Sequence, residues 1–173
     1  CMIYQKCLGF NKSELGDFNL MQFLYQTIKE IIDTGRVGTP VFVRFIAHVL
    51  PSDEHIIDIL GRILTITGSW LNAMPIRIYV QHKENTAQIT ASVEYEDGQT
   101  AIASIGIATG LSSRIDLMML GNKGALYHDG EDMHPEFSMD IDLMVIPDWL
   151  IEAIERSLFI GKPVLIQEVL DIE

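Results

Sequence analysis

The chain is organised around the segment Gly35–Gly68, which reads GRVGTPVFVRFIAHVLPSDEHIIDILGRILTITG. Residues Val41 to Leu50 are apolar apart from Arg44 and His48, which predicts a strand that is covered on both faces. The residues Ser52 to Thr67 carry apolar side chains at helical spacing and predict a helix that Gly68 ends. The sequence therefore places a strand and a buried helix, joined by almost no loop, at the centre of the fold.

One face of this helix is polar and carries the candidate site. His55, Asp58, Arg62 and Thr65 share that face because they follow one another at spacings of three, four and three. A histidine can act as a general acid or base, so His55 is the acid/base candidate and Asp58 the carboxylate that would orient its ring. The alternative is a solvated stripe in which Asp58 pairs with Arg62. The opposite face is apolar and should contact the core: Ile56, Ile59, Leu60, Ile63 and Leu64.

A second amphipathic helix precedes the central segment. Its apolar residues recur at helical spacing, Asn19 can cap its start, and Gly35 can end it. Further upstream, Met2 to Leu8 predicts a short strand, and Asn11 to Asp17 is a polar turn. The apolar positions of the helix are Leu20, Phe23, Leu24, Ile28, Ile31 and Ile32.

The chain after the central helix alternates between apolar and polar residues, which predicts a series of strands. Asp97-Gly98 is a two-residue hairpin signal, so the strands on its two sides should pair antiparallel. The predicted strands are Met74–His82, Thr86–Glu96, Gln99–Ala108, Ser113–Leu120 and Ala125–His128.

Two helical segments follow these strands. Pro147 suits a first helical position and Gly161 an end, while Lys162 to Leu170 predicts the first turns of another helix. Two helices, a meander of strands and a closing helix predict an α+β fold, with a mostly antiparallel open sheet and helices packed on one face.

Composition narrows the classes of partner. A chain of 173 residues with 48% hydrophobic residues can bury one sizeable core. Its net charge of −12 argues against nucleic acid and against an anionic membrane, which both require clustered Lys and Arg. The absence of a long apolar run and of a signal-like segment predicts a cytoplasmic protein. Cys1 and Cys7 form neither a disulfide framework nor a zinc-ligand spacing.

Two further ligand classes lack their usual motifs. The segment His128–His134 contains residue types that bind metals, but it has no recognised ligand spacing and predicts a solvated acidic loop continuing to Pro135. The G-x-G-x-x-G fingerprint of dinucleotide-binding turns is absent. We therefore expect neither a metal nor a nucleotide cofactor to be bound by this chain.

The order of several motifs resembles the C-terminal half of the glucose–fructose oxidoreductase and inositol dehydrogenase (Gfo/Idh/MocA) family. These motifs span nearly the whole chain, and each one alone is weak. They are Ile28–Pro40, the helix that starts at His55-Ile-Ile-Asp58 and ends at Thr67-Gly68, the hairpin Tyr95–Gln99, the turn Leu120–Leu126 and the final stretch Ile154–Pro163.

The resemblance implies the substrate-binding and oligomerisation domain of an oxidoreductase that acts on a sugar, a polyol or a related small molecule. NAD or NADP would be bound by a separate nucleotide-binding domain. Residues 1–19 would be the trailing strand and linker from that domain, and residues 20–173 the α+β domain. His55 matches the family's histidine and Asp58 the carboxylate that commonly follows it, while Asn11 and Lys12 lie where the family's chain passes between domains and would touch substrate.

A second hypothesis is a non-catalytic dimerising or binding module that keeps the fold without the active site. It is favoured by Pro51, which stands where the family has an Asp four residues before the histidine. Under both hypotheses we expect a homo-oligomer, because the sheet face opposite the helices should carry an apolar surface made of Phe42, Ile46, Leu50, Ile102 and Ala108. The competing expectation is a monomer whose outer sheet face stays in water through Arg44, His48, Thr90, Ser92, Glu94, Arg114 and Asp116.

Overall fold

The computed structural model describes residues 20–51, 54–82, 87–107, 113–130 and 145–171. Within them a seven-stranded sheet has the strand order β6-β5-β1-β4-β3-β2-β7. The elements are α2 (Leu20–Asp33), β1 (Pro40–Val49), α3 (Ile56–Leu71), β2 (Pro75–His82), β3 (Gln88–Tyr95), β4 (Thr100–Ile107), β5 (Arg114–Gly121), β6 (Ala125–Asp129), α4 (Asp148–Ile160), β7 (Val164–Leu165) and α5 (Gln167–Leu170).

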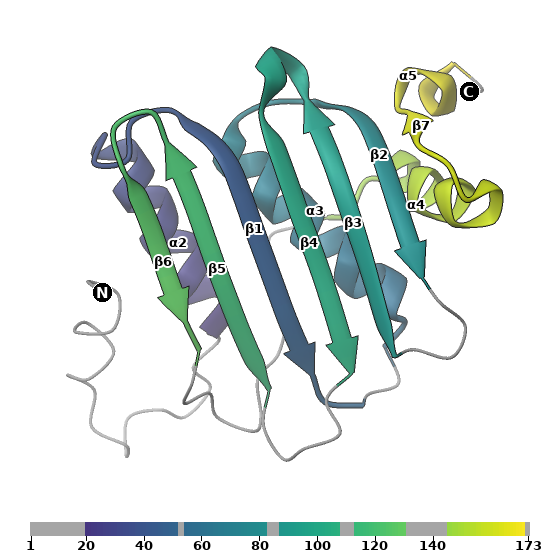
Figure 1. Ribbon diagram of the computed structural model, residues 1–173, viewed down its shortest axis with the longest axis horizontal. Coiled ribbons are helices and arrows are strands. Elements are labelled where there is room, and N and C mark those ends of the chain that lie inside the picture. Colours follow the sequence, from purple (N-terminus) through teal and green to yellow (C-terminus); the bar gives the residue numbers. More distant parts are fainter. Residues whose placement is uncertain (1–19, 52–53, 83–86, 108–112, 131–144, 172–173) are drawn as a thin grey trace.

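The sheet is mixed, with β1 near its middle. β1 pairs antiparallel with β5 and parallel with β4, whereas the other neighbouring pairs are antiparallel. The parallel pair arises because α3 carries the chain away from β1, and the hairpins from β2 to β4 then bring it back beside β1 (Figure 1). The predicted α+β class and the mostly antiparallel open sheet are confirmed.

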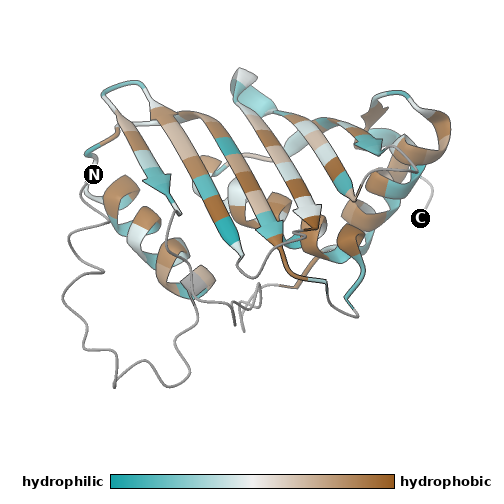
Figure 2. Cartoon of the chain, turned by 60° about the horizontal axis from the view of Figure 1, so that its bottom comes forward, coloured by the Kyte–Doolittle hydropathy of each residue, from teal (hydrophilic) through white to brown (hydrophobic). Residues whose placement is uncertain are grey.

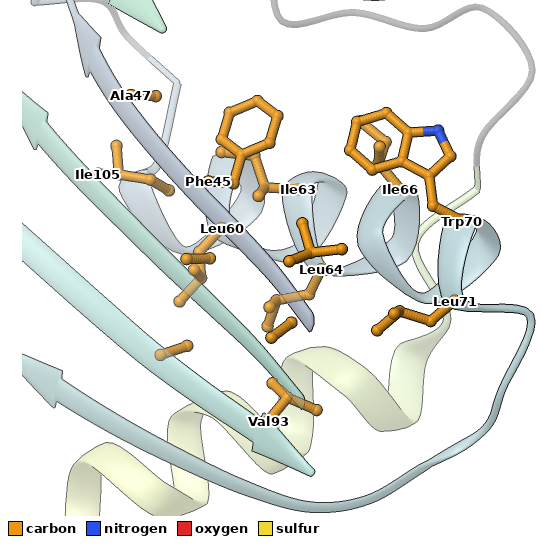
Figure 3. Close-up of a cluster of buried hydrophobic side chains, with 14 of the residues drawn as sticks. Phe45, Ala47, Leu60, Ile63, Leu64, Ile66, Trp70, Leu71, Val93 and Ile105 are labelled. Carbon is orange, nitrogen blue, oxygen red and sulfur yellow. The ribbon is translucent and has the colours of Figure 1, made fainter. Parts of the chain in front are cut away.

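The long helices cover one face of the sheet (Figure 1). Side chains alternate between the two faces of β1. Val43, Phe45 and Ala47 point to the helix side, where they are fully buried in the core. Trp70 of α3 stacks on the Phe45 ring at a centroid distance of 6.4 Å (Figure 3). The predicted core face of α3 is also correct, since Ile59, Leu60, Ile63 and Leu64 are buried.

The predicted bounds of α3 are wrong at both ends. The helix begins at Ile56, with His55 as its N-cap, and it runs through Gly68 to Leu71. Gly68 does not end it because the apolar pattern continues, and Trp70 and Leu71 are buried. Asn72 instead takes the left-handed conformation that ends the helix, at a φ of 50°.

The hairpin between β3 and β4 exists, but its turn has three residues, Glu96 to Gly98. The Tyr95 N–H donates to the Gln99 carbonyl at 2.9 Å and closes the turn. Asp97 and Gly98 have φ values of 54° and 77°. These left-handed conformations explain why an Asp-Gly pair occupies the turn.

The C-terminal prediction also needs correction. Lys162 to Leu170 does not form one helix, because Val164 and Leu165 form β7 against β2, and α5 begins only at Gln167. Val164 is 1% exposed, so its burial beside the sheet outweighs helix propensity here.

Two other predictions extend beyond the described residues. β6 includes His128 and Asp129, so the first two residues of the predicted acidic loop are strand. The rest of that loop to Pro135, apart from the buried Gly130, and the predicted strand Met2–Leu8 lie outside the described residues.

The sheet face opposite the helices, here called the open face, divides into two halves. Figure 2 shows that hydrophobic and hydrophilic residues alternate along the strands. The polar half lies on β3 and β4, where Ser104 contacts Gln88 and Thr90 at 2.9 Å each. The apolar half lies mainly on β1, β5 and β6 and has the apolar residues Phe42, Ile46, Ile102, Met118, Leu120 and Tyr127. It also contains exposed Arg44, which lies between Ile102 and Met118, and it borders Arg114 and Asp116 of β5.

Candidate functional site

His55 lies at the N-terminal end of α3, directly after the turn from β1. It is the N-cap residue, with φ −71° and ψ 131°, and its side chain is exposed and makes no capping hydrogen bond. Its carbonyl accepts the N–H groups of Asp58 at 2.9 Å and Ile59 at 3.3 Å. The backbone of His55 is thus fixed by the first helical turn, while its imidazole remains accessible.

The other polar residues of this face lie close to His55 along the helix. Asp58 is half-buried in the first turn of α3. Arg62, in the next turn, forms an ion pair with Glu54, which precedes the helix. Glu54 was not predicted as part of the site, since an interaction between residues eight apart across a helix start has no sequence signal comparable to the i, i+4 rule.

The structure does not test the two other predicted site residues. Asn11 and Lys12 lie outside the described residues. Of the predicted site residues, the described part of the chain contains His55 and Asp58, which are joined by the backbone hydrogen bond of the first helical turn. No hydrogen bond joins the His55 ring to the Asp58 carboxylate in this part of the chain, so the orienting role of Asp58 stays a prediction.

A cleft of about 410 Å³ lies at the opposite end of α3 from His55. The C-terminal half of α3, the adjoining ends of β2 and β3, and the start of α4 line it with mainly apolar side chains. Its polar wall residues Thr65 and Ser69 donate to α3 carbonyls. At its inner wall, burial raises the pKa of Tyr95 to about 12, although a hydrogen bond with Thr67 opposes the shift. Sequence spacing gave no signal for this cleft.

A charged network occupies the end of β5 on the open face. Arg114 binds Asp116 at 3.1 Å and Asp129 at 3.0 Å. Burial alone would raise the pKa of Asp116, but Arg114 and the Gly130 backbone outweigh it, so this pKa is lowered. Burial lowers the pKa of His128, although the nearby carboxylates of Asp116 and Asp129 act to raise it.

Within the described ranges, no three His, Cys, Asp or Glu side chains are grouped so that they could hold a metal ion. No helix of that part of the chain is long and apolar enough to cross a membrane.

Known proteins resemble this chain in structure. No family model and no curated protein sequence matches it. A myo-inositol 2-dehydrogenase from Lactobacillus plantarum matches with a TM-score of 0.65 and 14% identity, over 82% of this chain and 61% of its own. A scyllo-inositol dehydrogenase from Lactobacillus casei, with bound NAD(H) and scyllo-inositol, has a TM-score of 0.61 at 10% identity, over 85% of this chain and 63% of its own. A probable dehydrogenase from Thermotoga maritima has a TM-score of 0.62 at 12% identity, over 86% of this chain and 63% of its own.

The chain has the fold of Gfo/Idh/MocA-family dehydrogenases. Its fold matches the C-terminal region of these dehydrogenases over most of its residues. The chain spans about three-fifths of the length of the Gfo/Idh/MocA structures that it matches.

Proposed function

We propose that this chain is the C-terminal substrate-binding and oligomerisation domain of an NAD- or NADP-dependent oxidoreductase that acts on a sugar, a polyol or a related small molecule. The observation that carries the proposal is the place of His55, which is exposed at the start of α3 in a fold shared with inositol dehydrogenases. A solved relative with this fold holds both NAD(H) and scyllo-inositol.

The nucleotide itself does not fit the residues of this chain. The turn from β1 to α3 reads Leu50-Pro-Ser-Asp-Glu-His55 and contains no glycine that would let a backbone approach a pyrophosphate. It also carries Asp53, whose carboxylate would repel phosphate, and the carboxylate of Glu54 is already paired with Arg62. A separate domain would therefore supply the nucleotide site.

The proposed chemistry of this chain is proton transfer. Oxidation of a secondary alcohol to a ketone would transfer the hydride of the carbinol carbon to the NAD⁺ or NADP⁺ of the separate domain and release the hydroxyl proton. A neutral imidazole within hydrogen-bond reach can accept that proton. His55 has the required exposure, and Asp58 lies in the adjacent helical turn, where its carboxylate would orient the ring. In the reverse direction, protonated His55 would return the proton to the nascent alkoxide.

A second candidate function is a non-catalytic dimerising module. Pro51 favours it, because this residue replaces the carboxylate that the family places four residues before the histidine. The open face favours self-association under either function, because its apolar half includes Ile102, 37% exposed, and Tyr127, 58% exposed. A second copy packed on this half would bury these side chains.

The experiment that tests the first function is an activity screen of the full-length protein that contains this chain. We expect reduction of NAD⁺ or NADP⁺ with at least one member of a panel of inositols, sugars and sugar acids. A folded full-length protein that reduces neither nucleotide with any of them would favour the non-catalytic module. In parallel, calorimetric titration of residues 1–173 with NADH should show no binding at micromolar affinity.

A further inference from the structure

The cleft at the C-terminal end of α3 has the size and the lining of a small-molecule site. Its volume of about 410 Å³ lies within the range of roughly 300 to 1,000 Å³ that is typical of ligand pockets. Most of its lining is apolar and includes Leu64 of α3 and Val93 of β3, which are labelled in Figure 3. The cleft is lined by the C-terminal half of α3, whereas His55 precedes this helix, so the two are separate places on the molecule.

Gly68 keeps one wall of the cleft open beside the Tyr95 ring. A Cβ atom at Gly68 would lie 3.5 Å from Tyr95 Cε1 and 3.8 Å from the Tyr95 hydroxyl oxygen. These are ordinary van der Waals distances, so a methyl group would fit, but a longer side chain would extend into the cleft. Gly68 therefore does not end the helix, as its sequence position suggested, and instead leaves space on the helix surface.

The charges around the cleft favour a cation. Exposed Glu96 lines it, and the described lining residues include no Lys, Arg or His. α3 ends here at Leu71, so the partial negative charge of its C-terminal carbonyl groups lies at the same end of the helix. Trp149, a half-buried residue of α4, adds an aromatic wall, and the faces of aromatic rings attract cations.

We propose that this cleft binds a small amine with an apolar body. The body lies against the apolar walls that α3, β3 and α4 provide, and the ammonium group lies near Glu96 and the C-terminal end of α3. An anion with the same body is disfavoured, because its charge would face the Glu96 carboxylate. This binding site is independent of proton transfer at His55.

Nuclear magnetic resonance titration of the 173-residue chain with 2-phenylethylamine tests the proposal. We expect the amide signals of Gly68, Ser69 and Ala73, which line the cleft, to shift and to saturate with a dissociation constant of about 1 mM or lower. The matched anion 3-phenylpropionate should bind at least about tenfold more weakly, because the cleft lining carries a carboxylate and no cation among its described residues.

Three variants separate the cleft from the rest of the surface. Glu96→Gln should weaken binding of the amine about three- to fivefold, because it removes the carboxylate and keeps its size. The control Asp97→Asn changes the neighbouring exposed carboxylate, which does not line the cleft, and should stay within about twofold of the wild type. Gly68→Leu should abolish binding by filling the cleft, while α3 stays folded because leucine is a better helix former than glycine.

The position of the shifts distinguishes this site from general attraction of an amine to a chain with a net charge of −12. Shifts that do not saturate, or that occur at exposed carboxylates away from the cleft, would overturn the proposal. Equal affinity for 3-phenylpropionate would overturn it as well, and so would binding that Gly68→Leu leaves unchanged.

Discussion

The hydroxyl oxygens of Thr67 and Tyr95 lie 3.4 Å apart in the core and join α3 to β3. Thr67 also donates to the Leu64 carbonyl at 3.0 Å. Either hydroxyl can supply the hydrogen between Thr67 and Tyr95. Burial raises the pKa of Tyr95 from 10.0 to about 12, since the phenolate would lose its hydration.

The burial of Tyr95 predicts a loss of stability in alkali. The folded state holds the Tyr95 proton more tightly than the unfolded chain, so the contribution is fully present below pH 10 and is lost as the pH rises from 10 to 12. A change of about two pKa units corresponds to roughly 2 to 3 kcal/mol in the free energy of unfolding. Urea unfolding at a series of pH values should show this decline, and Tyr95→Phe should flatten it. Tyr79→Phe, at a half-buried tyrosine of β2 that lies outside the apolar half of the open face, should keep the wild-type slope.

Removal of the Ser157 hydroxyl should lower the free energy of unfolding by more than the titration of Tyr95, and it should do so at neutral pH. Its oxygen accepts the Val80 N–H at 2.9 Å and its hydrogen is donated to the Lys162 carbonyl at 2.9 Å, while the side chain is fully buried. Ser157→Ala would leave both backbone groups without this partner, which costs about 2 to 4 kcal/mol. Ser69→Ala is the control, because this exposed hydroxyl bonds only its own helix and should change stability by less than about 0.5 kcal/mol. Equal effects of the two substitutions in urea unfolding would contradict the assignment.

The apolar half of the open face predicts self-association. Sedimentation of the wild-type chain at micromolar concentration should show a species larger than 19.5 kDa. Ile46→Glu and Ile102→Arg should each dissociate it, because the new charge would be buried beside a like charge on the neighbouring strand, Asp116 for Ile46 and Arg44 for Ile102. Phe159→Glu, at a 91% exposed side chain on α4, should leave it assembled. A single 19.5 kDa wild-type species would rule out the dimer at this concentration.

Strand periodicity was a reliable guide to this fold. The alternation in β1 correctly separated Val43 and Phe45, which are buried, from Phe42 and Ile46, which face the open side. It did not indicate that β1 pairs parallel with β4, because pairing direction depends on how the chain returns after α3.

Short sequence signals gave wrong element boundaries where the burial of neighbouring side chains favoured a different end. Gly68 resembled a helix end, but α3 continues to Leu71 with Asn72 as its C-cap, because this extension buries Trp70. The candidate site was only partly predictable for a similar reason. Helical spacing predicts the polar stripe from His55 to Arg62. It does not predict the ion pair between Glu54 and Arg62, because Glu54 lies in the turn before the helix, where side chains follow no regular spacing.

The most direct test of the central claim is the rate of alcohol oxidation by the full-length protein with His55→Ala, measured on whichever polyol or sugar the wild type turns over. The control is His82→Ala, an exposed histidine on β2 whose ring contacts the Gln88 carbonyl. If His55 accepts the hydroxyl proton, kcat/KM should fall by about 10²-fold or more in His55→Ala and stay within a few-fold in His82→Ala, with both variants folded. An unchanged kcat/KM in His55→Ala would contradict the account.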